Sequence, residues 1–409
     1  MQDRKYNMRV VHIGNVAKGK DGEIYCLKNY AAFYEELAGY ISNPEVYAGF
    51  IEEGDMGFDF LNEQPISRQI NFTLAPGNTP DTATGSFFLN NFRLIWRLLR
   101  FSGAKQHYFV FLPSPLGIFS AWVVMKLKRK KSLGIYIGGY YGREQQYETR
   151  KQGIKRVIKR FMSDRIDRYI TSLVEKSDYT ITSSYEYFEQ FKMYGRIFLT
   201  PPLMNVGVTD LVPVEGSQQR SKFITYCGEL RHAKGIIDLV NAFVVLSKEE
   251  KFSEYKLKII GSGQALEELR NIVDSNGLGD RVVFCGQVKN ALRLKQEIAD
   301  SAFFVLPSYS EGFPRVAYEC FTLGVPTILT PVGGIPFLVK DREHCLFCKP
   351  GDTTSIVEAM RDMVTDQQLR QKLAENARRL MSQNIFPRIQ RDVSLANMIV
   401  NKVEQLNTA

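Results

Sequence analysis

The chain has 409 residues, too many for one compact core, and its length predicts two domains. Hydrophobic residues make up 44% and charged residues 24%, which excludes a disordered chain and indicates a soluble globular protein. The net charge of +9 is concentrated in residues 1–205, which carry 28 Lys and Arg against 20 Asp and Glu. Such a basic half indicates an anionic partner (a phosphorylated substrate, a membrane surface or nucleic acid) or simply a solvated helical face.

The first residues, MQDRKYNMRVVHIGN, contain no long apolar segment, so we expect no secretory signal. Six cysteines are scattered without the spacing of a disulfide framework, which fits a reducing cytosol. The most apolar stretch, 109–131, is too short and too rich in proline and glycine to span a bilayer. We therefore expect a cytoplasmic location, with peripheral contact at the inner face of the cell membrane as an open alternative.

The first half alternates short apolar runs with segments of helical period. Residues 9–14 predict a strand, 15–24 a polar loop and 25–41 a helix. Further strands are expected at 108–113, 133–139 and 178–184. This alternation favours a parallel sheet built from right-handed crossover units.

One helix of this half, predicted at 150–168, is amphipathic. Ile154, Val157, Ile158 and Phe161 share one face, and a dense basic set occupies the other. The apolar face packs on the sheet or, alternatively, contacts anionic lipid, which would suit a lipid-linked acceptor.

A segment rich in proline, glycine and polar residues, 200–219, predicts a linker. After it the pattern restarts with five strand candidates: 222–230, 255–263, 281–288, 303–308 and 325–331. The predicted fold class is therefore α/β, with two doubly wound Rossmann-like domains facing a cleft, where open parallel sheets bind their ligands. The predicted units are 1–204, 205–388 and a last helix, 389–409, that packs back on the first domain.

The segment SEGFPRVAYECFTLG holds two carboxylates, Glu311 and Glu319, around a Gly-Phe-Pro turn. It follows a predicted strand, so the N–H groups of Gly312, Phe313 and Arg315 would lie at a helix N-terminus, which favours anions such as a diphosphate. The two carboxylates can accept hydrogen bonds from sugar and ribose hydroxyls. Alternatively, one Glu stands near a helix start and the other on a solvated face.

The longer run EGFPRVAYECFTLGVPTILTPVGG closely resembles the E-x7-E segment of retaining GT-B glycosyltransferases of glycosyltransferase family 4, the group 1 transferases. Other segments resemble this family in the same order: YCGELRHAKGIIDLVNAF, IIGSGQALEELR, DRVVFCGQV and KPGDTTSIVEAM. The resemblance covers residues 220–384 well and the first half only as a general pattern.

The resemblance implies a retaining transferase that moves a sugar from a UDP- or GDP-sugar to an acceptor hydroxyl, in cell-surface polysaccharide or lipid-linked glycan synthesis. The first domain would bind the acceptor and the second the nucleotide sugar. The implied partners are this donor and a glycan or lipid-linked acceptor, with no nucleic acid.

Three side chains would be catalytic by this resemblance: Lys234, Arg231 and Glu311. Lys234 would neutralise the diphosphate with Arg231 as helper, and Glu311 would contact the donor sugar. No Asp-x-Asp follows a strand, and Cys345 and Cys348 lack a second pair, so we expect neither a metal nor another cofactor. The leaving diphosphate would then be stabilised by positive side chains and a helix N-terminus.

The other residues implied by the resemblance bind the substrate. Gly312, Phe313 and Pro314 would contact the donor sugar, and Glu319 would hold the ribose. The base would meet backbone groups near Gln287 and Val288. From the first domain, Gly14 and the loop that starts at Asn15 would approach the donor phosphates or the acceptor.

The sequence departs from the family pattern in three places. Glu229 stands where an arginine often follows the glycine, which puts the phosphate clamp in question. The segment IGGYYGR, 137–143, has no histidine where the family often has one near the reacting sugar. Ile335, Pro336 and Phe337 stand where a glutamate frequently follows Gly334.

Other functions stay open. A nucleotide-sugar 2-epimerase shares this architecture but would need converging carboxylates and histidines, and the chain has four histidines in all. A non-catalytic protein that binds sugar nucleotides or glycans would need no reacting groups. Nucleic-acid binding through the basic half is a third alternative, and it predicts salt-dependent retention on DNA.

Overall fold

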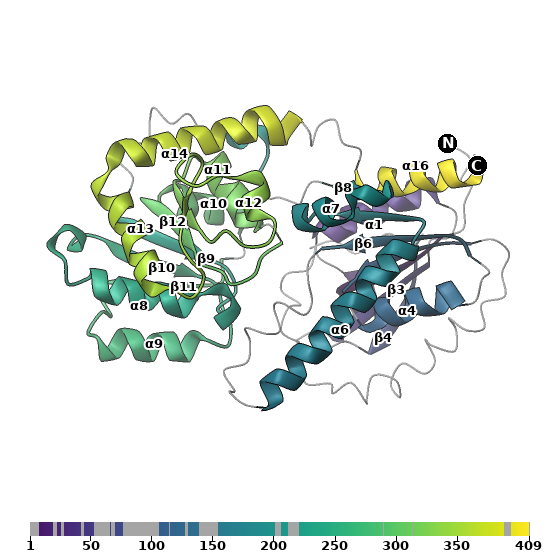
Figure 1. Cartoon of the computed structure of the whole chain (residues 1–409), viewed down its shortest axis with the longest axis horizontal. Helices are drawn as coiled ribbons and strands as arrows, with labels where there is room; N and C mark the ends of the chain where they lie inside the picture. Colours follow the sequence, from purple (N-terminus) through teal and green to yellow (C-terminus); the bar gives the residue numbers. More distant parts are fainter. Residues whose placement is uncertain are drawn as a thin grey trace.

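The strands gather into two separate sheets, one in each half of the chain (Figure 1). The computed structural model describes residues 8–18, 23–25, 28–41, 45–52, 66, 70–76, 106–113, 115–126, 130–138, 154–200, 206–211, 221–288, 290–312, 314–387 and 394–408. Both sheets carry helices on both faces, so the predicted fold class of two doubly wound α/β domains is confirmed.

The first domain has its strands in the order β4-β3-β1-β5-β6-β7-β8. All neighbours in this order are parallel, and β2 pairs with the end of β1 in the antiparallel direction. The strands are β1 Met8–Lys18, β2 Ile24–Tyr25, β3 Glu45–Glu52, β4 Asn71–Pro76, β5 Gln106–Leu112, β6 Lys130–Ile137, β7 Tyr179–Thr182 and β8 Ile197–Leu199.

Two apolar cores flank this sheet because the side chains of its strands alternate between the faces. Phe109 and Phe111 of β5 pack on one face, and Tyr108 and Val110 pack on the other. The first face is covered by α1 (Lys28–Tyr40) and α16 (Leu395–Thr408). The second face is covered by α4 (Pro115–Lys126), α6 (Ile154–Lys176) and α7 (Tyr185–Phe191).

The second domain has six parallel strands in the order β11-β10-β9-β12-β13-β14. The strands are β9 Phe223–Cys227, β10 Lys256–Ile260, β11 Val282–Gly286, β12 Phe303–Leu306, β13 Thr327–Leu329 and β14 Leu346–Phe347. Its helices are α8 Ile236–Leu246, α9 Leu266–Ser275, α10 Ala291–Ala299, α11 Arg315–Thr322, α12 Ile335–Leu338, α13 Thr353–Thr365 and α14 Gln367–Leu380.

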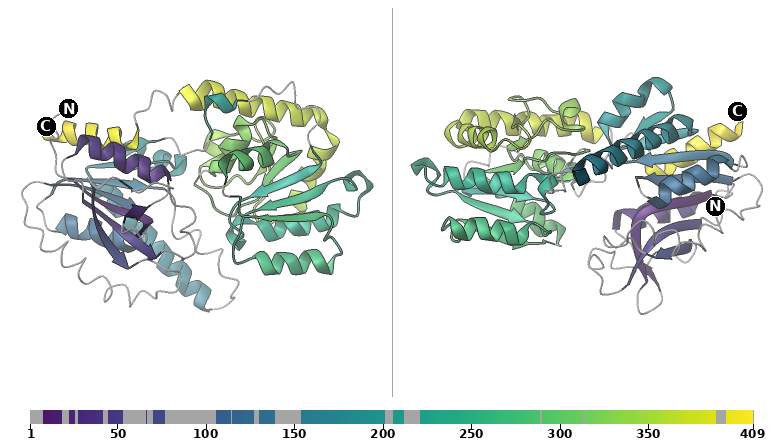
Figure 2. Two further views of the ribbon diagram at one scale, coloured as in Figure 1. Left: turned by 180° about the vertical axis from the view of Figure 1, so that it is seen from behind. Right: turned by 60° about the horizontal axis from the view of Figure 1, so that its bottom comes forward.

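The helices of this domain lie in two layers, with α8, α9 and α13 on one side of the sheet and α10, α11 and α14 on the other (Figures 1 and 2). A single apolar cluster joins both layers to the sheet. Short turns complete the chain: η2 Lys192–Tyr194, η3 Val208–Asp210, η5 His232–Lys234, η6 Glu250–Phe252 and the π-helical η7 Met381–Ile385.

The polar loop predicted at 15–24 is wrong in its first part. β1 continues through Lys18, because it pairs with β3 along that length and with β2 at its end. The predicted helix at 25–41 correspondingly begins at Lys28. No strand is predicted from the sequence at β3, β4 or β8, which owe their pairing to neighbours far along the chain.

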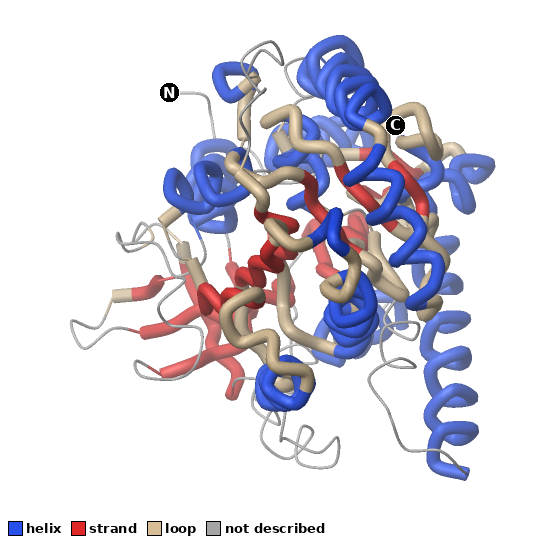
Figure 3. The backbone as a smooth tube through the Cα atoms, turned by 90° about the vertical axis from the view of Figure 1, so that its left-hand side faces the viewer, coloured by secondary structure: helices blue, strands red, loops and turns tan. Residues whose placement is uncertain are grey.

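The amphipathic helix also differs from its prediction. α6 runs on to Lys176, and its first turns project from the body of the domain (Figures 1 and 3). Phe161, expected on the apolar face, is 56% exposed, whereas Ile170 and Leu173 carry the contact with the sheet. No helix in the described ranges is both long and apolar enough to cross a membrane.

The last helix, α16, lies beside α1 of the first domain (Figure 1). The side-chain amide of Asn397 donates to Glu36 of α1 at 3.3 Å, and Ser394 also donates to Glu36. Most of the linker predicted at 200–219 falls outside the described residues, which include only Thr200 and residues 206–211 of this segment.

Candidate functional site

The site forms where the strand order of the second domain reverses, between β9 and β12. Crossovers leave these two neighbouring strands in opposite directions, so a crevice opens at their carboxyl ends. Two loops meet there: residues 228–235 lead from β9 to α8, and residues 307–314 lead from β12 to α11.

Lys234 and Glu311 bring the two loops together as an ion pair. The Nζ atom of Lys234 lies 2.8 Å from Oε1 of Glu311, and their side chains are 17% and 9% exposed. Oε1 of Glu311 also accepts from the hydroxyl of Ser308 at 2.7 Å. These residues are 77 positions apart in the chain, and the parallel sheet places them at one edge.

The chain can follow this path because of Gly235. This residue has a φ of 65°, and a Cβ at this position would overlap the carbonyl oxygen of Pro307. The backbone N–H of Tyr309 donates to the carbonyl of Ala233 at 2.9 Å and links the same two loops. The Lys-Gly pair therefore ends the 3₁₀ turn η5 with Lys234 directed at the neighbouring loop.

The turn after Glu311 is held from the next strand. The N–H of Gly334 donates to the carbonyl of Gly312 at 2.7 Å, and the Thr330 hydroxyl donates to the carbonyl of Ser308 at 2.6 Å. Pro314 is the N-cap of α11, with extended backbone and no capping side chain. The first N–H groups of this helix therefore receive no side-chain cap and suit an anionic ligand. Phe313 lies outside the described residues.

Glu319 is buried in α11, with 5% exposure, so the alternative that it stands on a solvated face is wrong. It lies close to Cys227 at the end of β9. Burial and the neighbouring Glu319 carboxylate together raise the pKa of the Cys227 thiol to about 12. Both glutamates of the E-x7-E segment are thus directed at the carboxyl edge of the sheet near β9.

Arg231 does not extend freely toward this edge. Its Nε atom lies 2.9 Å from Oε2 of Glu229, the residue that departs from the family pattern. The Tyr226 hydroxyl donates to the carbonyl of Glu229 at 2.9 Å and holds this part of the loop. Burial raises the pKa of Tyr226, and the nearby carboxylate of Glu311 raises it further.

Gln287 and Val288 follow β11, two strands away from β9 in the sheet. Their loop adjoins the glycine turn after β10, because the N–H of Gly261 donates to the carbonyl of Gly286 at 2.8 Å. They do not contact the Lys234–Glu311 pair. Neighbouring strands lie about 4.8 Å apart, so these residues stand about 10 Å from β9 along the sheet edge.

The first domain approaches this site through the end of β6. A Cβ at Gly312 would lie 2.9 Å from the carbonyl oxygen of Gly138, so only glycine leaves ordinary space there. α7 also contacts α12 next to the site. Gly14 and Asn15 lie within β1, so the expectation of a loop starting at Asn15 is wrong; the side chain of Asn15 is among those not described.

Sequence reasoning missed three residues at or beside the site: Ser308, Tyr226 and Gly138. Ser308 had a signal, because it stands three residues before Glu311 in the same loop. Tyr226 stands just before the loop that carries Lys234, whereas Gly138 reaches the site only through the approach of the first domain. In the described part of the chain, no group of three or more His, Cys, Asp or Glu side chains is arranged to hold a metal ion.

Two Rossmann-like domains with such a site at the carboxyl edge of the second sheet define the GT-B fold class, which the solved structures share. Sucrose-phosphate synthase from Thermosynechococcus elongatus matches 99% of this chain and 98% of its own, with a TM-score of 0.63 and 18% identity. HepE of Anabaena, solved with UDP, matches 98% and 100%, with a TM-score of 0.61 and 14% identity. At these identities the likeness shows the fold alone.

The sequence comparisons concern the second domain. Residues 209–380 match the family model described as glycosyl transferases group 1. The N-acetyl-alpha-D-glucosaminyl L-malate synthase of Bacillus anthracis is 30% identical over 171 residues, 42% of this chain and 43% of the relative. A capsular polysaccharide biosynthesis glycosyltransferase of Staphylococcus aureus is 31% identical over 162 residues, 38% and 40% of the two chains. The match therefore spans less than half the length of these relatives.

Proposed function

We propose that the protein is a retaining, metal-independent glycosyltransferase of family 4 that moves a sugar from a nucleotide diphosphate sugar to an acceptor hydroxyl. The observation that carries this proposal is the Lys234–Glu311 pair beside the uncapped start of α11. It combines a positive side chain, backbone donors without a side-chain cap and a carboxylate acceptor at one sheet edge. The group 1 match over residues 209–380 supports the same reaction class.

The donor would lie along the carboxyl edge of the second sheet. Its base would meet the backbone near Gln287 and Val288, its ribose would bind Glu319, and its diphosphate would lie between β9 and β12. The spacing supports this order, because two strand intervals separate β11 from β9 and a nucleotide diphosphate spans a comparable length. UDP and GDP donors are both consistent with this arrangement.

Departure of the diphosphate would be assisted by charge. Lys234, Arg231 and the first N–H groups of α11 would stabilise the negative charge that develops on the leaving group. Glu311 would accept a hydrogen bond from a donor-sugar hydroxyl. For retention, the acceptor hydroxyl would attack from the side that the diphosphate leaves, and the departing phosphate oxygen would take its proton.

The acceptor is proposed to be a glycan or a lipid-linked glycan held by the first domain. The name of the Staphylococcus relative supports a role in polysaccharide synthesis. Exposed Trp122 on α4 and Phe161 on α6, with Arg165 over the Phe161 ring at 5.4 Å, support peripheral contact with an anionic membrane. No nucleic-acid partner forms part of the proposal.

The test is a thermal-shift and calorimetry panel with UDP, GDP, ADP and their common sugar conjugates. One nucleotide family at about one hundred times its dissociation constant should stabilise the protein by about 2.7 kcal/mol. Glu319→Gln should weaken that affinity by about 10-fold or more, because it removes a charged acceptor from a ribose diol. The control is Glu358→Gln, which alters an exposed glutamate of α13 and should change nothing.

The outcomes separate the alternatives. Binding of a nucleotide sugar followed by its slow hydrolysis, or by transfer to an added glycan, supports the proposal. Tight binding with neither reaction favours a non-catalytic binding protein, and conversion of the sugar without release of nucleotide favours an epimerase. If none of the nucleotides stabilises the protein, the donor site is wrongly assigned.

A further inference from the structure

Among the described residues, Arg315 differs from the other positive groups at the site because no carboxylate pairs with it. Lys234 pairs with Glu311, and Arg231 pairs with Glu229. Arg315 is the first residue of α11 and is exposed; its side chain makes no ion pair or hydrogen bond in the part of the chain that the structure describes. A guanidinium is always charged and carries five donors, so its surroundings decide what it can bind.

A pair of hydroxyl groups on the first domain lies within electrostatic reach of Arg315. The Tyr136 hydroxyl, at the end of β6, lies 3.0 Å from the Ser183 hydroxyl, which follows β7. Burial raises the pKa of Tyr136, while Ser183 and the positive charge of Arg315 act in the opposite direction. The same end of β6 carries Gly138, whose carbonyl lies against Gly312. Arg315 and this hydroxyl pair therefore stand on opposite domains at one meeting point.

This arrangement suits an anion. A sugar enclosed between the domains would remove water from the guanidinium, and an unpaired charge in such a place is costly. Neutral sugar hydroxyls compensate poorly, whereas a carboxylate or phosphate binds a guanidinium through two parallel hydrogen bonds. The diphosphate of the donor is already assigned to Lys234, Arg231 and the start of α11, which leaves Arg315 for a second anionic group.

We infer that Arg315, with the hydroxyls of Tyr136 and Ser183, binds a carboxylate or phosphate on the sugar side of the substrate. This inference rests on the proposed function and names its substrate class. The anionic group is carried either by the donor sugar, as in a uronic acid, or by the acceptor, as a phosphate or carboxylate substituent. Arg315 thus selects acidic over neutral substrates.

The experiment compares wild type, Arg315→Gln and Arg315→Lys by calorimetry. In the donor arm the probes are UDP-glucose and UDP-glucuronic acid, or GDP-mannose and GDP-mannuronic acid if the protein prefers guanosine. In the acceptor arm the probes are glycerol and glycerol 3-phosphate, added to the protein saturated with UDP or GDP. Lys372→Gln removes one positive charge from an exposed position of α14 and serves as the control.

In one arm we expect the acidic probe to bind about 10- to 100-fold more tightly than its neutral counterpart, as for a hydrogen-bonded charge pair. Arg315→Gln should abolish this preference, Arg315→Lys should retain part of it, and Lys372→Gln should retain all of it. Binding of UDP or GDP alone should be unchanged in every variant.

Normal nucleotide binding with no acidic preference in either arm would overturn this inference and leave the proposed function intact. The same holds for a preference that survives Arg315→Gln. If neither UDP nor GDP binds the wild type, the proposed function fails first, and this inference falls with it.

Discussion

The second domain contains two Lys–Glu ion pairs of nearly equal length and different surroundings. Lys234 and Glu311 lie 2.8 Å apart at the carboxyl edge of the sheet, and Lys258 and Glu297 lie 2.7 Å apart on the face that α10 covers. The exposures are also similar, at 17% and 9% for the first pair and 7% and 24% for the second. Contact geometry alone therefore does not distinguish a binding group from a structural one.

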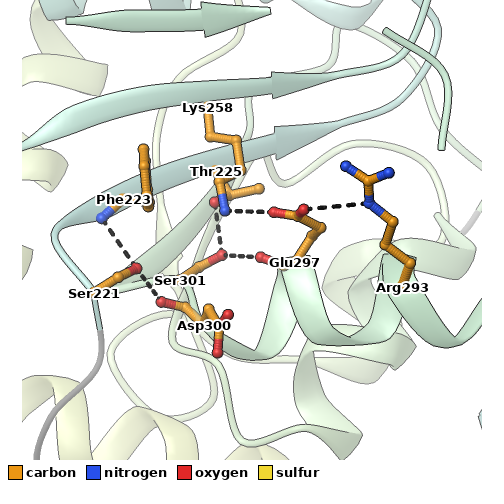
Figure 4. Close-up of polar contacts among 8 residues, drawn as sticks. All are labelled: Ser221, Phe223, Thr225, Lys258, Arg293, Glu297, Asp300 and Ser301. Carbon is orange, nitrogen blue, oxygen red and sulfur yellow. Dashed lines mark hydrogen bonds and ion pairs between the residues drawn. The ribbon is translucent and has the colours of Figure 1, made fainter. Parts of the chain in front are cut away.

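The Lys258–Glu297 pair belongs to a closed network between regular elements (Figure 4). Lys258 on β10 stacks over the Phe223 ring at 4.2 Å, and Glu297 on α10 also pairs with Arg293 one turn away. Below it, Ser301 donates to Thr225 at 2.6 Å. A strand and a helix thus fix both charges, which makes the pair a link between the layers of the domain.

The Lys234–Glu311 pair is built from two loops instead. Lys234 stands on a 3₁₀ turn and Glu311 precedes an uncapped helix, both at the point where the strand order reverses. Loops at this edge can exchange a partner for a ligand without disturbing the sheet. The place of an ion pair in the topology, more than its length, is therefore the guide to whether it serves folding or, as proposed for Lys234 and Glu311, binding.

Lys234→Met should have the largest effect, and this effect should fall mainly on the transfer rate. Loss of one preorganised positive group typically lowers a transfer rate by about 10²- to 10³-fold. Glu311 keeps its hydrogen bond from Ser308, so the thermal midpoint should fall by only a few degrees. Steady-state kinetics and a melting curve measure both, with Lys248→Met, an exposed lysine after α8, as the control. If the Lys234→Met variant loses stability but keeps its transfer rate, Lys234 has a structural role like that of Lys258.

Lys258→Met should show the opposite pattern. It leaves Glu297 without its main partner and should lower the free energy of unfolding by about 3 kcal/mol, as for a broken buried pair. Nucleotide affinity of the folded protein should be unchanged. The double variant Lys258→Met/Glu297→Leu should recover most of the loss in urea unfolding. If the double variant is less stable than Lys258→Met, Glu297 stabilises the fold through a contact other than its pair with Lys258.

Acid should weaken the structural pair. The hydrogen bond from Lys258 and the nearby Arg293 lower the pKa of Glu297 below the ordinary value of 4.5. The folded state then favours the ionised form, so this stabilisation is full above pH 4.5 and is lost as the pH falls through the lowered pKa. Urea unfolding between pH 3 and 6 should therefore be less pH-dependent in Glu297→Gln than in wild type. If the free energy of unfolding changes equally with pH in both proteins, the ionised Glu297 carboxylate does not contribute this stabilisation.

Glu229→Gln should have the smallest effect, and in the favourable direction. It releases Arg231 from an ion pair whose carboxylate is 56% exposed, so the gain is at most about 1 kcal/mol. Affinity for UDP or GDP should rise by about 2- to 5-fold in calorimetry. The exposed pair of Arg342 and Asp362 offers a control, because Asp362→Asn should leave that affinity unchanged. Weaker nucleotide binding in Glu229→Gln would show that Glu229 positions Arg231 rather than competing for it.

Much of the site follows from short stretches of sequence. The Lys-Gly ending of the η5 turn, the turn before α11 and the strands that precede both are local features, and each stands where the pattern predicts it. The conformation of these turns depends on residues a few positions away: Gly235 with its positive φ, and Pro314 at the start of α11. Alternation of strands and helices likewise predicts parallel sheets, because each apolar run must be covered on both faces.

Contacts between distant segments are what the sequence left undetermined. Only pairing with β2 and β3 carries β1 through Lys18, and only the packing of α6 decides that Phe161 is exposed. The loop that pairs Arg231 with Glu229 is likewise held by a distant segment, because the N–H of Leu230 donates to the carbonyl of Ser262 at 2.9 Å.

The sequence by itself therefore determined the two-domain α/β class and the glutamates and lysine of the second domain. The tertiary structure alone decided which of two similar Lys–Glu pairs faces the first domain, and that the charge of Arg315 acts on Tyr136, whose hydroxyl contacts Ser183. The physical reason is that turns and helix starts are specified by neighbouring residues. The partners of charged residues, in contrast, depend on the order of the strands in the sheet, which brings together residues such as Lys234 and Glu311 that are 77 positions apart.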